Sequence, residues 1–163
     1  MSSRGWLIGN ALWLQLGWWG CVLGAQHVAL LAAVAAGLIA HLWLCRQRAG
    51  ECLAILTVGV AGCVLDVLLG VLGLFDFHGE ILPVWLALLW LVFASGLRHC
   101  LAWAASPAWW GGLLGAAGGP LAYWGGASLA GVGLPWGNGA SAVVLALVWA
   151  VWLPLMLKLA LRW

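Results

Sequence analysis

One acidic residue of this chain lies deep within a long apolar stretch. Asp66 is flanked on both sides by valine and leucine, and at 100° per residue it shares a helical face with the glycines of segment 59–73. An acid in hydrocarbon costs at least about 2.5 kcal/mol, so it usually faces the interior of a helix bundle. Two interpretations follow: Asp66 handles protons or binds a substrate, or it is a polar clasp between helices.

Tyr123 is the residue that we expect to meet Asp66. It lies on another apolar segment, at roughly the same depth from the same end of the bundle if each residue adds about 1.5 Å. Both residues sit on stripes of small side chains, which allow neighbouring helices to approach closely. The sequence therefore predicts that these two stripes face each other and that the tyrosine hydroxyl hydrogen-bonds the acid.

A second group of polar residues lies within about two turns of the end of the bundle that carries the Lys and Arg residues. This group comprises Asn10, His41, Ser95, Arg98 and His99, with Gln15 deeper and on a different face of its helix. A pocket lined by imidazole and guanidinium groups would suit an anionic headgroup or a carboxylate. The alternative for Arg98 is that its side chain extends to the lipid headgroups. No catalytic residue can be assigned.

Histidines raise the question of a cofactor or metal. His41 and His99 could ligate haem or a metal across two helices, but isolated histidines on apolar faces are more often packing groups, so no cofactor is predicted. Asp76, His78 and Glu80 alternate in a polar loop and are weak candidates for a divalent cation. The five cysteines show no CxxC spacing and read as small apolar residues.

Composition sets the class of protein. The chain is 66% hydrophobic and 6% charged, whereas soluble domains are about 25% charged. This balance predicts an integral membrane protein. The net charge of +2 comes from scattered basic residues and predicts no nucleic-acid partner.

The hydrophobic segments predict an all-α fold with one domain, residues 1–163, made of six transmembrane helices. Each segment is close to the roughly 20 residues that a bilayer requires. The predicted helices are about 5–24, 28–45, 52–75, 84–104, 108–127 and 139–160. The connections between them are short, so a compact bundle is expected.

The basic residues predict the orientation of this bundle. With six alternating spans, all Lys and Arg residues fall on one side, namely Arg4, Arg46, Arg48, Arg98, Lys158 and Arg162. Asp76 and Glu80 fall on the other side, which has no basic residue. Because basic loops stay inside, both termini are expected to be cytoplasmic.

Three short motifs resemble one protein family. They are Asn10 and Gln15 with Gly17-Trp18, the Arg98-His99 pair followed by Trp103, and the stretch GGPLAYWGG at 118–126. Together with the buried Asp66, they resemble small bacterial inner-membrane proteins known only as a domain of unknown function. The resemblance implies a multi-pass protein of the bacterial inner membrane and carries no assigned activity. It also implies a lipid-related role, since members are encoded near fatty-acid-modifying methyltransferases and oxidoreductases.

Three hypotheses for the function remain open at this point. In the first, the protein binds or processes a lipid-like, fatty-acid-derived molecule in a polar pocket of the cytoplasmic half. In the second, it is a proton-coupled small transporter that uses Asp66. In the third, it is a non-catalytic assembly subunit whose glycine stripes bind another membrane protein or a second copy of the chain. Membrane lipids are partners in all three.

Overall fold

The computed structural model describes residues 3–163, which form six α-helices and one short 3-10 helix. The elements are α1 (Ser3–Gly24), α2 (Val28–Leu44), α3 (Arg48–Val71), α4 (Val84–Leu97), η1 (Ala102–Ala105), α5 (Ala108–Ala130) and α6 (Gly137–Ala160). Within these described residues the backbone forms no β-strand, only an isolated bridge between Asp76 and Gly133. The predicted all-α class is therefore confirmed.

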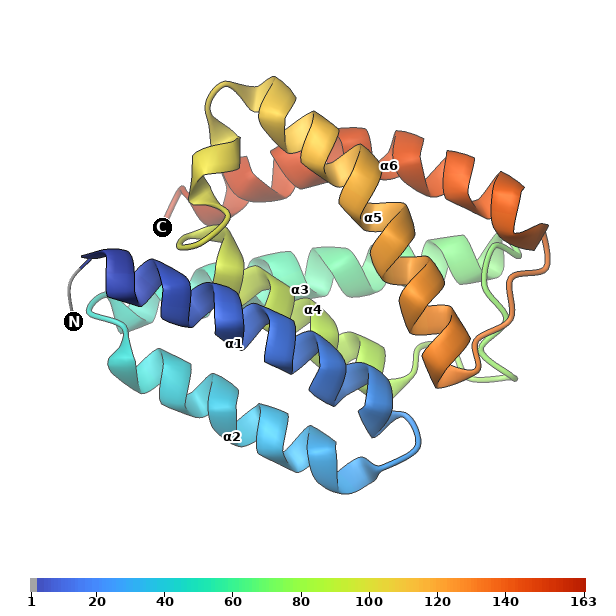
Figure 1. Cartoon of the computed structure of the whole chain (residues 1–163), viewed down its shortest axis with the longest axis horizontal. Helices are drawn as coiled ribbons and strands as arrows, with labels where there is room; N and C mark the ends of the chain where they lie inside the picture. The colour runs from blue at the N-terminus through green and yellow to red at the C-terminus, as the bar shows by residue number, and fades with distance from the viewer. Residues whose placement is uncertain (1–2) are drawn as a thin grey trace.

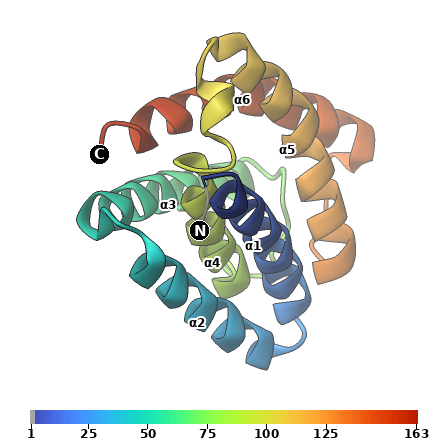
Figure 2. The same cartoon turned by 60° about the vertical axis from the view of Figure 1, so that its left-hand side comes forward.

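The helices alternate in direction, so both termini lie at the same end of the molecule (Figure 1). The α2–α3 turn and η1 lie at that end too, whereas the α1–α2, α3–α4 and α5–α6 connections lie at the opposite end. Helix α4 is the central element, because it packs against α1, α2, α3 and α6. Helices α5 and α6 form a closely packed pair that covers one side of the other four (Figure 2).

Two helices are long and apolar enough to cross a membrane, α3 and α6, each of 24 residues. Helices α2 and α4 are apolar but shorter, with 17 and 14 residues. A bilayer core of about 30 Å needs roughly 20 helical residues, so α4 by itself spans less than the full thickness.

The predicted fourth helix, 84–104, is wrong in its last third. Helix α4 ends at Leu97, and the chain continues through a turn into η1. Arg98 and His99 interrupt the apolar run directly after this point, but apolar residues resume at Leu101, so hydropathy alone does not place the break. A side chain from another helix supplies the reason: the Asn10 carbonyl oxygen accepts a hydrogen bond from the Cys100 backbone N–H at 3.1 Å.

Glycines allow close contact between specific helix pairs. A Cβ atom on Gly62 would lie 2.0 Å from the Trp90 ring, so α3 presses directly against an aromatic side chain of α4. On α5, a Cβ at Gly115 would lie 2.1 Å from the Trp149 carbonyl oxygen of α6. The expectation that the stripes of α3 and α5 face each other is therefore wrong: the first faces α4 and the second faces α6.

Candidate functional site

The Asp66 carboxylate is held by two aromatic side chains. Asp66 is 0% exposed, and its Oδ1 accepts a hydrogen bond from the Tyr123 hydroxyl at 2.6 Å. This confirms the predicted pair. The second oxygen, Oδ2, accepts from Trp90 Nε1 at 2.6 Å, a partner that sequence reasoning missed. The available signal was the depth of Trp90, since a buried indole N–H usually has an acceptor.

Aromatic rings surround this clasp and extend it towards α6. Tyr123 stacks on Phe75 with ring centroids 5.2 Å apart, and Trp90 stacks on Trp149 at 5.5 Å. Trp149 also meets the edge of Phe93. These rings form a continuous aromatic wall of residues from α4, α5, α6 and the α3–α4 connection, in which each ring contacts at least one other.

A cavity of about 410 Å³ lies on the other side of that wall. It is bordered by α1, α4, α5, α6 and residues of three connecting segments, and its lining is almost entirely apolar or aromatic. Along α4 it extends from Trp85 to Phe93, which corresponds to about 12 Å of helix axis. Trp90, Tyr123 and Trp149 contribute to its surface. It is thus an elongated apolar space with the Asp66 clasp in its wall.

The cavity reaches the surface between α1 and α5. Gln15 of α1 and Ala122 of α5 both line it, and both are exposed. Gly118 of α5 also lines it, and a Cβ there would meet no atom within 4 Å. Gln15 therefore places an amide at the mouth of an otherwise apolar site.

Asn10 and Ser95 connect α1 to the end of α4. The Asn10 amide nitrogen donates to the Ser95 carbonyl oxygen at 3.0 Å, while its oxygen accepts from the Cys100 backbone. The Ser95 hydroxyl accepts from Trp13 Nε1 at 2.9 Å and donates to the Val92 carbonyl at 2.6 Å. Both side chains are thus occupied by backbone and indole groups of the fold.

His41, Arg98 and His99 converge on a residue that sequence reasoning left in a loop, Glu51. Its Oε1 lies 3.0 Å from His41 Nε2, and its Oε2 lies 3.3 Å from His99 Nε2 and 3.4 Å from Arg98 Nη1. Glu51 is 2% exposed, and Cys45 lies beside the two imidazoles. The signal for Glu51 was charge: it is the one acid at the basic end of the predicted bundle.

Arg98 and His99 each have a further partner besides Glu51. Arg98 Nη2 donates to Gln47 Oε1 at 3.2 Å, and Trp6 Nε1 donates to His99 Nδ1 at 3.1 Å. An indole N–H can only donate, so Nδ1 of His99 is the acceptor and its Nε2 carries the proton that faces Glu51. The cluster joins α1, α2, α3 and the end of α4.

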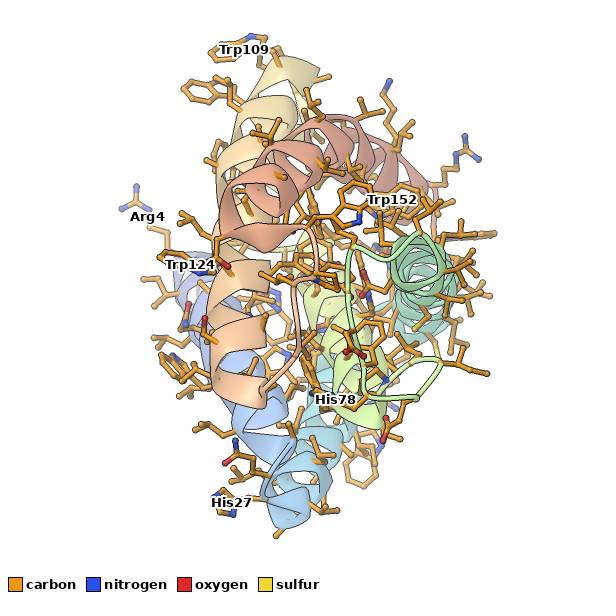
Figure 3. The ribbon with its side chains drawn as sticks, turned by 90° about the vertical axis from the view of Figure 1, so that its right-hand side faces the viewer. Arg4, His27, His78, Trp109, Trp124 and Trp152 are labelled. Carbon is orange, nitrogen blue, oxygen red and sulfur yellow. The ribbon has the colours of Figure 1, made fainter. Side chains whose placement is uncertain are left out.

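The polar loop at the opposite end is organised by its own hydrogen bonds. Asp76 Oδ1 accepts from the His78 backbone N–H at 2.8 Å, and His78 Nε2 lies 2.9 Å from the Gly131 carbonyl oxygen. His78 therefore ties the α3–α4 connection to the end of α5, at the end of the molecule that faces the viewer in Figure 3. Metal binding by Asp76, His78 and Glu80 stays a prediction.

This combination defines a class: an all-α bundle with a buried acid clasp, an apolar cavity and two helices able to cross a membrane. The chain belongs to the DUF2878 family, described as a protein of unknown function, whose sequence profile matches residues 7–155. The resemblance to a family of that kind is thereby confirmed. No curated protein and no solved structure matches the chain.

Proposed function

We propose that this protein is a multi-pass inner-membrane protein that binds a lipid-like, fatty-acid-derived molecule in the cavity between α1, α4, α5 and α6. The observation that carries the proposal is the cavity itself. Its volume of about 410 Å³ lies within the roughly 300–1,000 Å³ of small-molecule sites. Its elongated apolar lining suits a hydrocarbon chain.

The surface of the bundle supports a membrane location with six spans. Large apolar side chains are exposed on every helix, including Leu12 on α1, Ile39 on α2, Val60 on α3, Val84 on α4, Leu121 on α5 and Leu147 on α6. In the view of Figure 3, side chains project outward from the helices. Exposed apolar surface of this extent is unusual for a soluble monomer and supports contact with a bilayer.

The mouth of the cavity supports a lipid as the occupant. It opens sideways between α1 and α5, so a chain can enter from the bilayer without crossing water. Gln15 stands at this mouth and offers a hydrogen-bond donor and an acceptor to a carboxyl or ester group. We place the binding site here rather than at the cytoplasmic polar group, because the charges of Arg98 and Glu51 already pair with each other.

The other two functional hypotheses gain no specific support. Both oxygens of Asp66 are held by hydrogen-bond donors within the protein, as a structural clasp requires. The glycine stripes of α3 and α5 pack against Trp90 and Trp149 of the same chain rather than lying open for a partner.

Photo-crosslinking tests the proposal. The probe is a fatty acid with a diazirine near the end of its chain, added to the full-length protein in lipid nanodiscs. Gly118→Leu fills the cavity without a clash at the Cβ position. Gly139→Leu is the matched control, since its Cβ also meets no atom within 4 Å and it lies at the start of α6, away from the cavity lining.

We expect labelled residues to lie on α4 and α5 along the cavity. Labelling in Gly118→Leu should fall at least fivefold, while Gly139→Leu should match the wild type. Equal labelling in the two variants, or labels spread over the lipid-facing surface alone, would overturn the proposal.

A further inference from the structure

We propose that His41, Cys45, Glu51 and His99 form a binding site for Zn(II) at the end of the bundle that holds both termini. The ligand atoms of these four residues lie within 4.8 Å of one another, and three of the residues are buried. The site lies apart from the cavity lining, so it stands or falls independently of lipid binding.

The spacing of the four ligand atoms fits a tetrahedral ion. Ligands about 2.0 to 2.3 Å from Zn(II) in a tetrahedron lie about 3.3 to 3.8 Å from one another. The Glu51 oxygens lie 3.0 Å from His41 Nε2 and 3.3 Å from His99 Nε2. The sulfur of Cys45 lies 3.5 Å from His41 Nε2 and 3.8 Å from His99 Nε2. Small side-chain movements would complete the geometry.

Three helix ends supply the ligands. His41 and Cys45 are four residues apart at the end of α2, so they project from the same face. Glu51 lies in the first turn of α3, directly after the short α2–α3 turn, and His99 follows the end of α4. The α2–α3 turn therefore brings three of the four ligands together within eleven residues.

The donor set selects the metal by its chemistry. Two imidazoles, one thiolate and one carboxylate are ligands that tetrahedral Zn(II) accepts, whereas Mg²⁺ and Ca²⁺ prefer oxygen alone. Coordination releases the Cys45 thiol proton to solvent, and the thiolate and the carboxylate together balance the two positive charges of the ion. Arg98 can still orient the carboxylate from outside the first set of ligands, as partners of metal-bound carboxylates commonly do.

Trp6 provides a distinctive feature of this site. Its N–H donates to His99 Nδ1, which holds the ring proton on Nε2. Coordination through Nε2 requires that proton on Nδ1, so the indole N–H must turn away when the ion binds. Trp6→Phe keeps an aromatic ring against His41 and removes this competing donor.

The experiment uses full-length protein in nanodiscs, titrated with Co(II) and then with Zn(II). Tetrahedral Co(II) bound to a thiolate gives visible d–d bands and a near-ultraviolet charge-transfer band, and Zn(II) should displace it at one ion per chain. Cys45→Ser should remove the charge-transfer band and weaken binding at least tenfold. Cys52→Ser, at an exposed position one turn into α3, should leave both unchanged.

The wild-type spectrum decides the question even if Cys45→Ser does not fold. Octahedral Co(II) bands, no charge-transfer band, or equal losses in the two cysteine variants would overturn the site. Trp6→Phe should bind Zn(II) as tightly as the wild type or more tightly. Weaker binding by this variant would overturn the assignment of His99 as a ligand and with it the four-ligand site.

Discussion

Asp66 and Glu51 are both buried acids, but their surroundings differ in charge. Glu51 lies against the Arg98 guanidinium and two imidazoles, so its charge is compensated within the protein. Among residues 3–163, the side chains that hydrogen-bond Asp66 are the neutral donors of Tyr123 and Trp90. Asp66 therefore stabilises the fold through its two hydrogen bonds. For that contribution, the ability of its side chain to accept hydrogen bonds matters more than its negative charge.

Substitutions at Asp66 should separate these effects. In Asp66→Asn, the amide oxygen can accept from Trp90 while the amide nitrogen donates to the Tyr123 oxygen, so we expect a loss of at most about 1 kcal/mol in the free energy of unfolding. Asp66→Leu leaves two buried donors without an acceptor and should cost about 2–5 kcal/mol. Denaturation in mixed micelles measures both values.

Tyr123→Phe provides the control, since it removes one donor and leaves the acid in place. Membrane hydrogen bonds of this type are worth about 0.6 to 1.7 kcal/mol, and the loss should fall in that range. If Asp66→Asn destabilised the protein as much as Asp66→Leu, the structural role of the clasp would be wrong. If Asp66→Asn keeps its stability as expected, it can also be used in proton-flux assays in liposomes.

At the scale of elements, the close approach of α3 and α4 depends on a glycine, Gly62, at their interface. Gly62 lies one turn before Asp66 on the same face of α3, and its missing side chain lets the Trp90 ring lie against the helix backbone. That contact places the Trp90 N–H against the carboxylate. Packing and hydrogen bonding thus depend on the same close approach.

Gly62→Ala should therefore destabilise the protein although alanine favours helices. Its Cβ would overlap the Trp90 ring, and overpacking of this kind costs about 1–3 kcal/mol. Gly118→Ala meets no atom within 4 Å and should be neutral or stabilising by up to about 1 kcal/mol. Comparing the two melting curves checks the prediction, and equal stability would contradict it.

At the scale of the whole molecule, the ends of the bundle differ in charge. The helix order places Arg4, Arg46, Arg98 and Arg162 at the end that holds the termini, while Asp76 and Glu80 lie at the other end. The same basic end carries the Glu51 cluster. The two proposed sites differ accordingly. The metal ion would bind in the Glu51 cluster at the basic end, and the hydrocarbon chain would lie in the cavity that runs towards the other end.

This arrangement predicts the orientation in the membrane. A green fluorescent protein fused to the carboxyl terminus should fluoresce, because that end is expected in the cytoplasm. Alkaline phosphatase fused after Glu80 should be active, because the loop is expected outside. A dark fluorescent-protein fusion at the carboxyl terminus, or an inactive alkaline phosphatase after Glu80, would contradict six alternating spans.

The sequence by itself determined the helical class, the alternation of six apolar segments and the Asp66–Tyr123 pair. These follow from composition, periodicity and depth, which are local or nearly one-dimensional properties of the chain. Tertiary structure decided which helix faces meet. It showed that Trp90 completes the Asp66 clasp and that Asn10 holds the chain where α4 ends. It also showed that Glu51 and Cys45 join two histidines.

These contacts escaped the sequence for a physical reason. Within hydrocarbon, almost any apolar face can pack against any other. Hydropathy therefore identifies the apolar helices but does not predict which of them contact each other. The pairing depends on shape, here on single glycines opposite indole rings, and on where a few polar atoms find partners. The cavity follows from the same packing, because α5 approaches α6 through Gly115 while a Cβ on Gly118, which lines the cavity, would meet no described atom within 4 Å.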